Sequence, residues 1–335
     1  MFIVNSYLLA VVFCFITMLC WGSWANTQKL AGKTWRYELF YWDYVIGILL
    51  FSIFLGLTLG STGDAGRSFI ADLKQVTPGN YVSALIGGAV FNLGNILLSA
   101  AVSLAGMTVA FPLGVGIALV LGVVVNYMGS PKGDPTLLFF GVLLVVIAIV
   151  LNAIASGRVQ RAGGKSGSSK GVLTAVAAGV LMSFFYRFVA SAMDLNNFES
   201  PTPGMATPYS AFFIFAVGIF LSNFVFNTIV MRRPFVGRPV SYDEYCRGGF
   251  NTHLVGVFGG IIWGLGTALS YIAAGKAGAA ISYALGQGAP MIAALWGIFV
   301  WKEFKGASRS VGWLLTLMFI FFLSGLGAII LSGAN

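Results

Sequence analysis

The sequence contains ten apolar runs of about 20 residues each, and this pattern limits the possible folds more than any other feature. The runs lie near 5–28, 41–60, 80–104, 107–128, 136–157, 171–193, 208–231, 251–275, 278–301 and 309–332. Each is long enough to cross the hydrocarbon core of a bilayer as an α-helix. Only 9% of the 335 residues are charged, whereas a soluble domain carries about 25%. The sequence therefore predicts an all-α polytopic membrane protein, whose first run is a retained span and not a cleaved signal peptide.

The connections between the runs are mostly short and leave no room for a soluble catalytic domain. The stretch "RVQRAGGKSGSSKG" (158–171) has the composition of a flexible polar linker. It contains Gly-Lys-Ser but has Val159 where a phosphate-binding loop needs glycine, which argues against nucleotide binding. We therefore predict a five-span segment at 1–157, a linker at 158–170 and a second five-span segment at 171–335, which together form one transmembrane transport domain.

The distribution of lysine and arginine predicts the orientation in the membrane. If both termini lie outside, 14 of the 19 basic residues fall in cytoplasmic connections, among them those of the central linker, and four fall outside. The net charge of +9 is explained by this asymmetry and gives little support for nucleic-acid binding. We expect a bacterial inner-membrane protein with both termini outside and linker 158–170 in the cytoplasm.

Two distant stretches of the sequence are nearly the same. "GGAVFNLGN" (87–95) and "GGIIWGLGT" (259–267) are 172 residues apart, and this register continues to "FPLGVG" (111–116) and "YALGQG" (283–288). An odd number of spans in each half inverts the second half relative to the first. The sequence thus predicts two inverted five-helix repeats, an arrangement that recurs in transporters, with the substrate site between the repeats.

The repeated glycines have two readings. Glycines such as Gly88 and Gly260 let membrane helices approach closely, and packing is the favoured role. Gly114 and Gly286 each lie close to a proline, Pro112 or Pro290, so both the fourth and the ninth span are expected to be interrupted or at least kinked. Interrupted helices at matching positions indicate a central binding site.

Uncharged polar and aromatic side chains within the spans are the candidates for solute binding, because polar groups at membrane depth need a partner or a cavity. They recur at helical spacing in the third, eighth and ninth spans and suggest a pocket for a small neutral polar solute, although hydrogen bonds between helices are an equally good explanation for any single residue. Tryptophans could stack on a ring. The predicted substrate-binding residues are Trp24, Asn92, Asn95, Trp263, Thr267, Tyr283 and Gln287.

Three charged residues in or beside spans are candidates for ion coupling or for a charged site: Asp43, Arg187 and Glu303. An interfacial ion pair with Lys33, Arg36, Lys302 or Lys305 is the alternative for the two acids, and snorkelling is the alternative for Arg187. The single histidine, His253, has no carboxylate or cysteine close to it in the sequence, so no metal site is expected. No pattern predicts a cofactor.

Several motifs resemble the ureide permease family of the drug/metabolite transporter superfamily. They are "WGSW" (21–24), "WDY" (42–44), "GGAVFNLGN" with "LAGMTV" (104–109), and "VVNY" (124–127). The resemblance is densest from Gly22 to about Asn152. It implies ten helices in two inverted repeats and secondary active import of allantoin, uracil, xanthine or similar heterocycles, driven by protons.

The resulting hypothesis is a proton-coupled importer of a ureide or nucleobase that works without enzymatic chemistry. Its expected partners are the solute, the lipid bilayer and either protons or sodium. The sequence does not decide between a monomer and a homo-oligomer. A sugar importer or a metabolite or drug exporter on the same fold is the first alternative. A structural or channel-like membrane protein is the alternative from another class.

Overall fold

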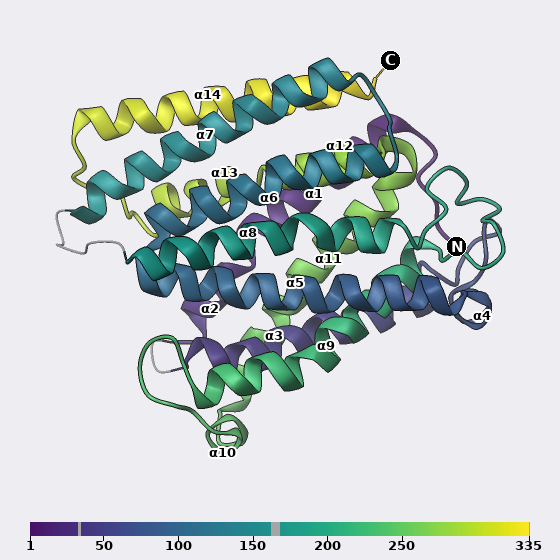
Figure 1. The fold of residues 1–335 in the computed structure, drawn as a ribbon, viewed down its shortest axis with the longest axis horizontal. Coiled ribbons are helices and arrows are strands. Elements are labelled where there is room, and N and C mark those ends of the chain that lie inside the picture. The colour runs from purple at the N-terminus through teal and green to yellow at the C-terminus, as the bar shows by residue number, and fades with distance from the viewer. Residues whose placement is uncertain (33–34, 162–167, 335) are drawn as a thin grey trace.

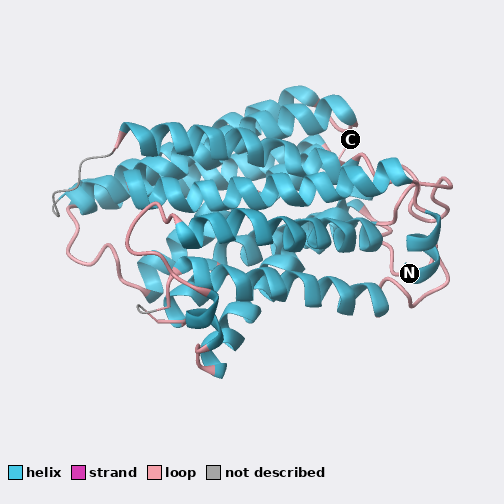
Figure 2. Ribbon diagram, turned by 60° about the horizontal axis from the view of Figure 1, so that its bottom comes forward, coloured by secondary structure: helices cyan, strands magenta, loops and turns pink. Residues whose placement is uncertain are grey.

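The computed structural model describes residues 1–32, 35–161 and 168–334. Within these ranges, ten helical segments are long and apolar enough to span a membrane, which confirms the predicted spans. They run side by side along the molecule with loops at both ends (Figure 2). The spans are α1 with α2 (Tyr7–Ser23, Ala25–Leu30), α3 (Tyr37–Leu57), α5 (Pro78–Ala105), α6 (Met107–Gly129), α7 (Pro135–Arg161), α8 (Ser169–Ala190), α9 (Pro208–Arg232), α11 (Phe250–Ala277), α12 with α13 (Ala279–Gly286, Ala289–Leu295) and α14 (Arg309–Ser332). Short helices α4 (Phe69–Gln75) and α10 (Tyr242–Cys246) lie in two connections.

Both termini lie at the same end of the bundle, as an even number of spans requires (Figure 1). The C-terminal end of α7 and the N-terminal end of α8 lie at the opposite end, together with α10. We call these the termini end and the linker end. Local signals begin several helices: the Ser6 hydroxyl accepts a hydrogen bond from the backbone of Leu9 at the start of α1, and proline opens α5 and α9.

The packing of the helices repeats when the two halves are exchanged. Helix α5 packs against α8 and α9, and its counterpart α11 packs against α1 and α3. Helix α6 packs against α8, as its counterpart span, α12 with α13, packs against α1, and the contacts of α3 with α9, α6 with α12 and α7 with α14 join counterparts. This is the pattern that a two-fold relation between the halves produces.

The matched glycines lie where helix backbones meet. A Cβ on Gly88 would collide with the carbonyl oxygen of Phe215 in α9, and a Cβ on Gly260 would collide with that of Tyr44 in α3. Gly106 and Gly278, also 172 residues apart, adopt φ values of 81° and 85°, which favour glycine, where α5 turns into α6 and α11 into α12. The glycines therefore serve the predicted packing role.

The contacts divide eight spans into two groups. We call α5, α6, α8 and α9 the α5 group, and α1, α2, α3, α11, α12 and α13 the α11 group, because the helices of each pack closely with one another. Helices α7 and α14 pair along one side of the bundle (Figure 1). Each group draws helices from both halves of the chain, so a site between the groups lies between the repeats as well.

The two predicted interruptions differ in outcome. The ninth span breaks between Gly286 and Ala289, then ends in a π-helical turn at Trp296–Val300. In contrast, α6 runs without a break through Pro112. Pro112 lies near the start of its helix, where a lost N–H disturbs few backbone bonds, whereas Pro290 follows two glycines in the middle of a span.

Candidate functional site

Four predicted residues and several unpredicted ones gather where α1, α3, α5 and α11 meet. Trp263 of α11 stacks on Phe91 of α5, with ring centroids 4.4 Å apart and planes 29° apart, and on Trp21 at 6.2 Å. Trp24 contacts Tyr44 of α3 at 4.6 Å. We call Trp21, Trp24, Tyr41, Tyr44, Phe91, Asn95, Trp263 and Thr267 the aromatic cluster. It joins the α5 group, through Phe91 and Asn95, to the α11 group.

Hydrogen bonds orient the polar members of this cluster. The Asn95 amide donates from Nδ2 to the hydroxyl of Tyr41 at 3.2 Å, and Trp21 Nε1 donates to Thr267 Oγ1 at 3.0 Å. The Thr267 hydroxyl itself donates to the backbone carbonyl of Trp263 at 3.0 Å. All the members of the cluster are uncharged, so it suits a neutral solute with ring and amide groups.

The tyrosines of α3 were missing from the sequence analysis. Tyr37, Tyr41 and Tyr44 are spaced i, i+4 and i+7 and lie on one helix face. The hydroxyls of Tyr37 and Tyr44 are buried and have no hydrogen-bond partner among the described residues. Because a buried hydroxyl is normally paired, these two are open positions for a ligand or water. The helical spacing in "YELFYWDY" was the signal that could have identified them.

Asn92, although predicted beside Asn95, faces a different helix. Its Nδ2 donates to the carbonyl of Ile219 at 3.3 Å and to the hydroxyl of Ser222 at 2.9 Å, both in α9. It therefore joins helices within the α5 group and lies outside the aromatic cluster. This is the inter-helix role that the sequence analysis considered as the alternative.

Tyr283 connects the two groups, and a second tyrosine, Tyr186, connects them in the opposite direction. Its hydroxyl donates from α12 to the carbonyls of Ala118 at 3.0 Å and Met182 at 3.3 Å, both in the α5 group. Tyr186 of α8 reaches the opposite way and donates to the carbonyl of Ser270 at 3.0 Å. Both tyrosines are fully buried, so the two groups are closed against each other at this level.

Gln287 lies in the turn that interrupts the ninth span and is 9% exposed. Its backbone N–H bonds to the carbonyl of Tyr283. The preceding residue, Gly286, packs directly against the Trp21 ring. Gln287 is thus next to a contact of the aromatic cluster, at the point where the helix breaks.

Asp43 lies at the linker end in a buried polar cluster of its own. Its carboxylate, 1% exposed, accepts hydrogen bonds from Tyr245 and His253 at 2.7 Å each and from Trp35 at 3.4 Å. Burial and the bond to Asp43 raise the pKa of Tyr245 in α10 above its ordinary value. The fold thus supplies His253 with the carboxylate that it lacks in the sequence. The described residues contain no group of three His, Cys, Asp or Glu side chains that could hold a metal ion.

The other two charged candidates lie far from the aromatic cluster in sequence and in contacts. Arg187 packs its guanidinium against Gly129 and lines a hollow of about 360 Å³ at the termini end. Glu303 pairs at the linker end with Lys29 at 2.7 Å, and both side chains are about half exposed. Its described partner is therefore a lysine that was not among those suggested by the sequence, one of which, Lys33, lies outside the described residues.

A cavity of about 150 Å³ lies between α1, α2, α6, α7 and α13 and reaches the Lys29–Glu303 pair. Both prolines singled out in the sequence, Pro112 of α6 and Pro290 of α13, line it. Its polar lining comes from Asn26 of α2 and from Asn152 and Ser156 of α7. Gly22, which neighbours Trp21 in α1, connects it to the cluster along the chain.

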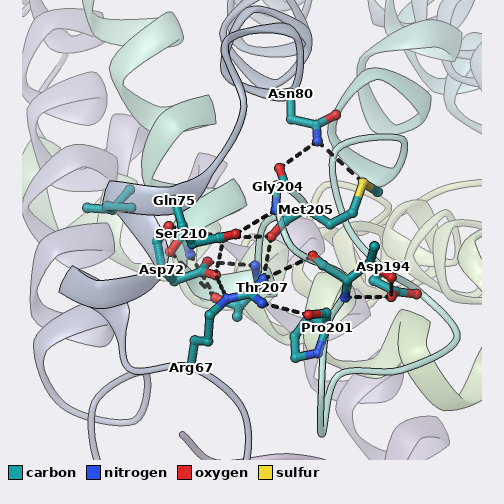
Figure 3. A network of polar contacts seen from close by, with 12 residues as sticks. Arg67, Asp72, Gln75, Asn80, Asp194, Pro201, Gly204, Met205, Thr207 and Ser210 are labelled. Atoms are coloured by element: carbon teal, nitrogen blue, oxygen red, sulfur yellow. Dashed lines mark hydrogen bonds and ion pairs between the residues drawn. The ribbon is translucent and has the colours of Figure 1, made fainter.

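The termini end is closed by a polar network between loops of the two halves (Figure 3). Asp72, fully buried, accepts hydrogen bonds from Arg67 at 2.8 Å, Gln75 at 3.0 Å and the backbone of Thr207 at 2.7 Å. Arg67 also donates to the carbonyls of Pro201 and Met205, at 2.6 Å each.

A smaller acid–hydroxyl pair lies in the same loop region. Burial acts to raise the pKa of Asp194, but hydrogen bonds from the backbone and hydroxyl of Thr202, at 3.0 and 2.7 Å, outweigh it and hold the pKa below its ordinary 3.8. The loops at this end are therefore held together by many polar contacts, whereas the linker end contains the cavity.

Comparisons with known proteins agree with this architecture. The family model described as Ureide permease matches residues 40–165 and 158–332. The chain is 24% identical to Ureide permease 2 and 23% identical to Ureide permease 1 of Arabidopsis thaliana, with complete coverage of both chains in each case. It is also 23% identical to the Glucose uptake protein GlcU of Bacillus subtilis over 77% of this chain and 85% of that protein. A solved crystal structure that is 19% identical superposes with a TM-score of 0.62 over 95% of each chain, which supports the fold alone.

Proposed function

Because the chain belongs to the ureide permease family, we propose that it is a secondary active transporter that imports a small neutral polar solute. A ureide or a nucleobase, such as allantoin or uracil, suits the site best. The relatives that cover the whole chain are named as ureide permeases, which supports this class of solute. We place the protein in a bacterial inner membrane with both termini outside and residues 158–170 in the cytoplasm.

The observation that carries the proposal is the aromatic cluster between the two helix groups. It brings Trp24 and Trp263 together with the Asn95 amide and the unpartnered hydroxyl of Tyr44, and a solute ring would take the place of one of the present ring contacts of these indoles. Planar heterocycles with adjacent carbonyl and N–H groups match such a set, because they stack on indoles and bond to amides and hydroxyls. Thr267 and Gln287 complete this site in our proposal, and Asn92 and Tyr283 hold the helices around it.

Transport would follow from rocking of the α5 group against the α11 group around this site. The halves 1–157 and 171–335 act as the inverted repeats of one transport domain. The loop network at the termini end and the buried tyrosine contacts between the groups fit a conformation in which the site is sealed from that side of the membrane. Separation of the Tyr186–Ser270 and Tyr283–Ala118 contacts would open that side.

A sugar is the second candidate solute, because the chain also resembles a protein named for glucose uptake. A metabolite or drug exporter on the same fold would move its solute in the opposite direction. A structural or channel-like protein would show no saturable uptake of solute. The permease relatives support transport over enzymatic activity.

The test is uptake of radiolabelled uracil and allantoin by cells that lack their own carriers. We expect saturable uptake above the empty-vector control, with competition between the two heterocycles. Uptake equal to the control for both compounds would contradict the proposed solute class. Competition by glucose in place of the heterocycles would favour the sugar alternative, and uptake that never saturates would favour a channel.

We propose that protons drive this uptake and that Asp43, buried at the linker end, is the coupling acid. Replacement of Asp43 by Asn removes the titratable group while the hydrogen bonds from Tyr245 and His253 keep an acceptor oxygen. Accumulation against a gradient should then be lost, whereas exchange of labelled for unlabelled solute should continue. Asp64→Asn, at an exposed acid of the termini end, is the matched control and should keep accumulation. If Asp43→Asn still accumulates solute, the coupling ion is bound elsewhere, and replacement of external sodium tests the second driver.

A further inference from the structure

We propose that the linker-end cavity is a second solute subsite that accepts a single polar ring, an inference that rests on the transport function proposed above. The cavity is lined by α1, α2 and α13 of the α11 group, by Pro112 of the α5 group and by α7. The cavity and the aromatic cluster share the α1–α2 segment, because Gly22 and Ala25 line the cavity and Trp21 and Trp24 belong to the cluster. None of the residues that carry its polar lining belongs to the aromatic cluster.

The polar lining is built on one face of a helix. Asn152 and Ser156 are one turn apart in α7, so their side chains share a face, and both line the cavity. Neither side chain forms a hydrogen bond to a described residue, which leaves an amide and a hydroxyl available to a solute. On the facing wall, Asn26 Oδ1 accepts a hydrogen bond from Trp301 Nε1 at 2.6 Å and is held in place by it.

The volume of the cavity limits the size of the solute that it can hold. A cavity of about 150 Å³ in another protein holds one benzene molecule, so this cavity, also about 150 Å³, has room for one five- or six-membered ring. A hexose, which carries a hydroxymethyl group and four or five hydroxyls around its ring, needs more room than this. The subsite therefore favours a monocyclic nucleobase such as uracil over a sugar.

The lining of the cavity at the linker end includes contacts that separate easily. Lys29 forms the ion pair with Glu303 and also lies 4.7 Å from the centroid of the Trp301 ring. Both charged side chains are about half exposed, and exposed pairs of this kind add little to stability. A solute could pass the pair without the rearrangement that the buried contacts at the termini end would require.

The experiment compares two neighbouring residues of α7. Ala153 lines the cavity, whereas Ile154 is 42% exposed on the outer surface of the bundle. In the full-length purified protein, Ala153→Phe should fill the cavity and lower the number of radiolabelled uracil molecules bound at saturation from two to one, whereas Ile154→Phe should keep two. Asn152→Leu removes the amide at similar volume and should weaken uracil binding at the second site about tenfold, so the test remains valid if Ala153→Phe fails to fold.

The outcomes separate the two proposals. If the wild-type protein binds and transports neither uracil nor allantoin, the proposed function fails. If the wild type binds uracil and both Ala153→Phe and Asn152→Leu bind it as well as Ile154→Phe does, the subsite is overturned while the function stands. Binding of glucose to the wild type as tight as that of uracil would also overturn the size selection.

Discussion

At the residue scale, the most informative side chains are those whose polar atoms are buried without a partner. Tyr44 is fully buried in the aromatic cluster, and its hydroxyl has no hydrogen-bond partner among the described residues. Burial of such a group costs free energy that folding alone does not recover. Asp72 shows the opposite case, a fully buried carboxylate whose oxygens are all engaged. The first kind of residue points to binding and the second to structure.

Tyr44→Phe separates these two roles. Removal of an unpaired hydroxyl should leave the apparent melting temperature unchanged or slightly higher, because the desolvation cost of about 1–3 kcal/mol disappears. If the hydroxyl bonds to the solute, uracil affinity should fall about tenfold. Thermal melts and equilibrium binding on the same preparation check both effects, and a stable variant with undiminished affinity would remove Tyr44 from the site.

Asp72→Asn should destabilise the protein through the Figure 3 network. The change leaves the Arg67 guanidinium without its carboxylate, and breaking a buried pair costs about 3–5 kcal/mol. We expect the lower end of this range, because the Arg67 side chain is 24% exposed and can still reach water. Thermal melts in detergent measure the loss, and Glu244→Gln, in the exposed Arg238–Glu244 pair, should cost much less.

At the scale of elements, glycine contacts decide which helices form pairs. Gly88 and Gly218 join α5 to α9 with backbone against backbone, and Gly47 and Gly260 join α3 to α11 in the same way. Packing of this kind supplies the attraction that the hydrophobic effect cannot supply between helices surrounded by lipid. It also holds each helix group together, so that motion is expected between the groups and not within them.

Substitution of these glycines by alanine should disrupt the pairs. In Gly88→Ala and Gly260→Ala the added methyl meets a backbone carbonyl that cannot move aside, so we expect a loss of about 1–3 kcal/mol from overpacking in each case. Gly327→Ala is the control, because its Cβ would enter open space. Unfolding in denaturant or by heat measures the three variants, and equal stability of all three would contradict the packing role.

At the scale of the whole molecule, the arrangement is asymmetric although its helix contacts are paired. The loop network at the termini end borders a hollow of about 360 Å³, whereas the cavity that reaches the linker end measures about 150 Å³ and lies between helices. A transporter needs both ends to open in turn, so the structure represents one of at least two states. The positions of the termini and of the linker at opposite ends make the orientation in the membrane testable.

The orientation can be checked with a native residue. Cys246 is exposed in α10 at the linker end, whereas Cys14 and Cys20 are buried. A membrane-impermeant maleimide should therefore label Cys246 in inside-out vesicles but not in intact cells. The Cys246→Ser variant gives the background, and labelling in intact cells would place the linker end outside.

The ten spans and the glycine pairs could be predicted from the sequence because each depends on the local order of residues. An apolar run is removed from water whichever helix it packs against. Gly88 and Gly260 allow the backbone of any neighbouring helix to approach closely. The interrupted ninth span followed in the same way from Gly286, Gly288 and Pro290, whereas Pro112 near a helix start had no such effect.

The partners of the polar side chains were decided by tertiary structure alone. Asn92 and Asn95 lie on the same helix less than a turn apart, yet one bonds to α9 and the other to Tyr41 of α3. His253 meets Asp43 across 210 residues. Hydropathy and spacing show which residues leave water and share a helix face, but which helix a face meets depends on how all ten pack together. For that reason the sequence by itself determined the kind of protein, and only the packed helices decided which of its polar groups can meet a solute.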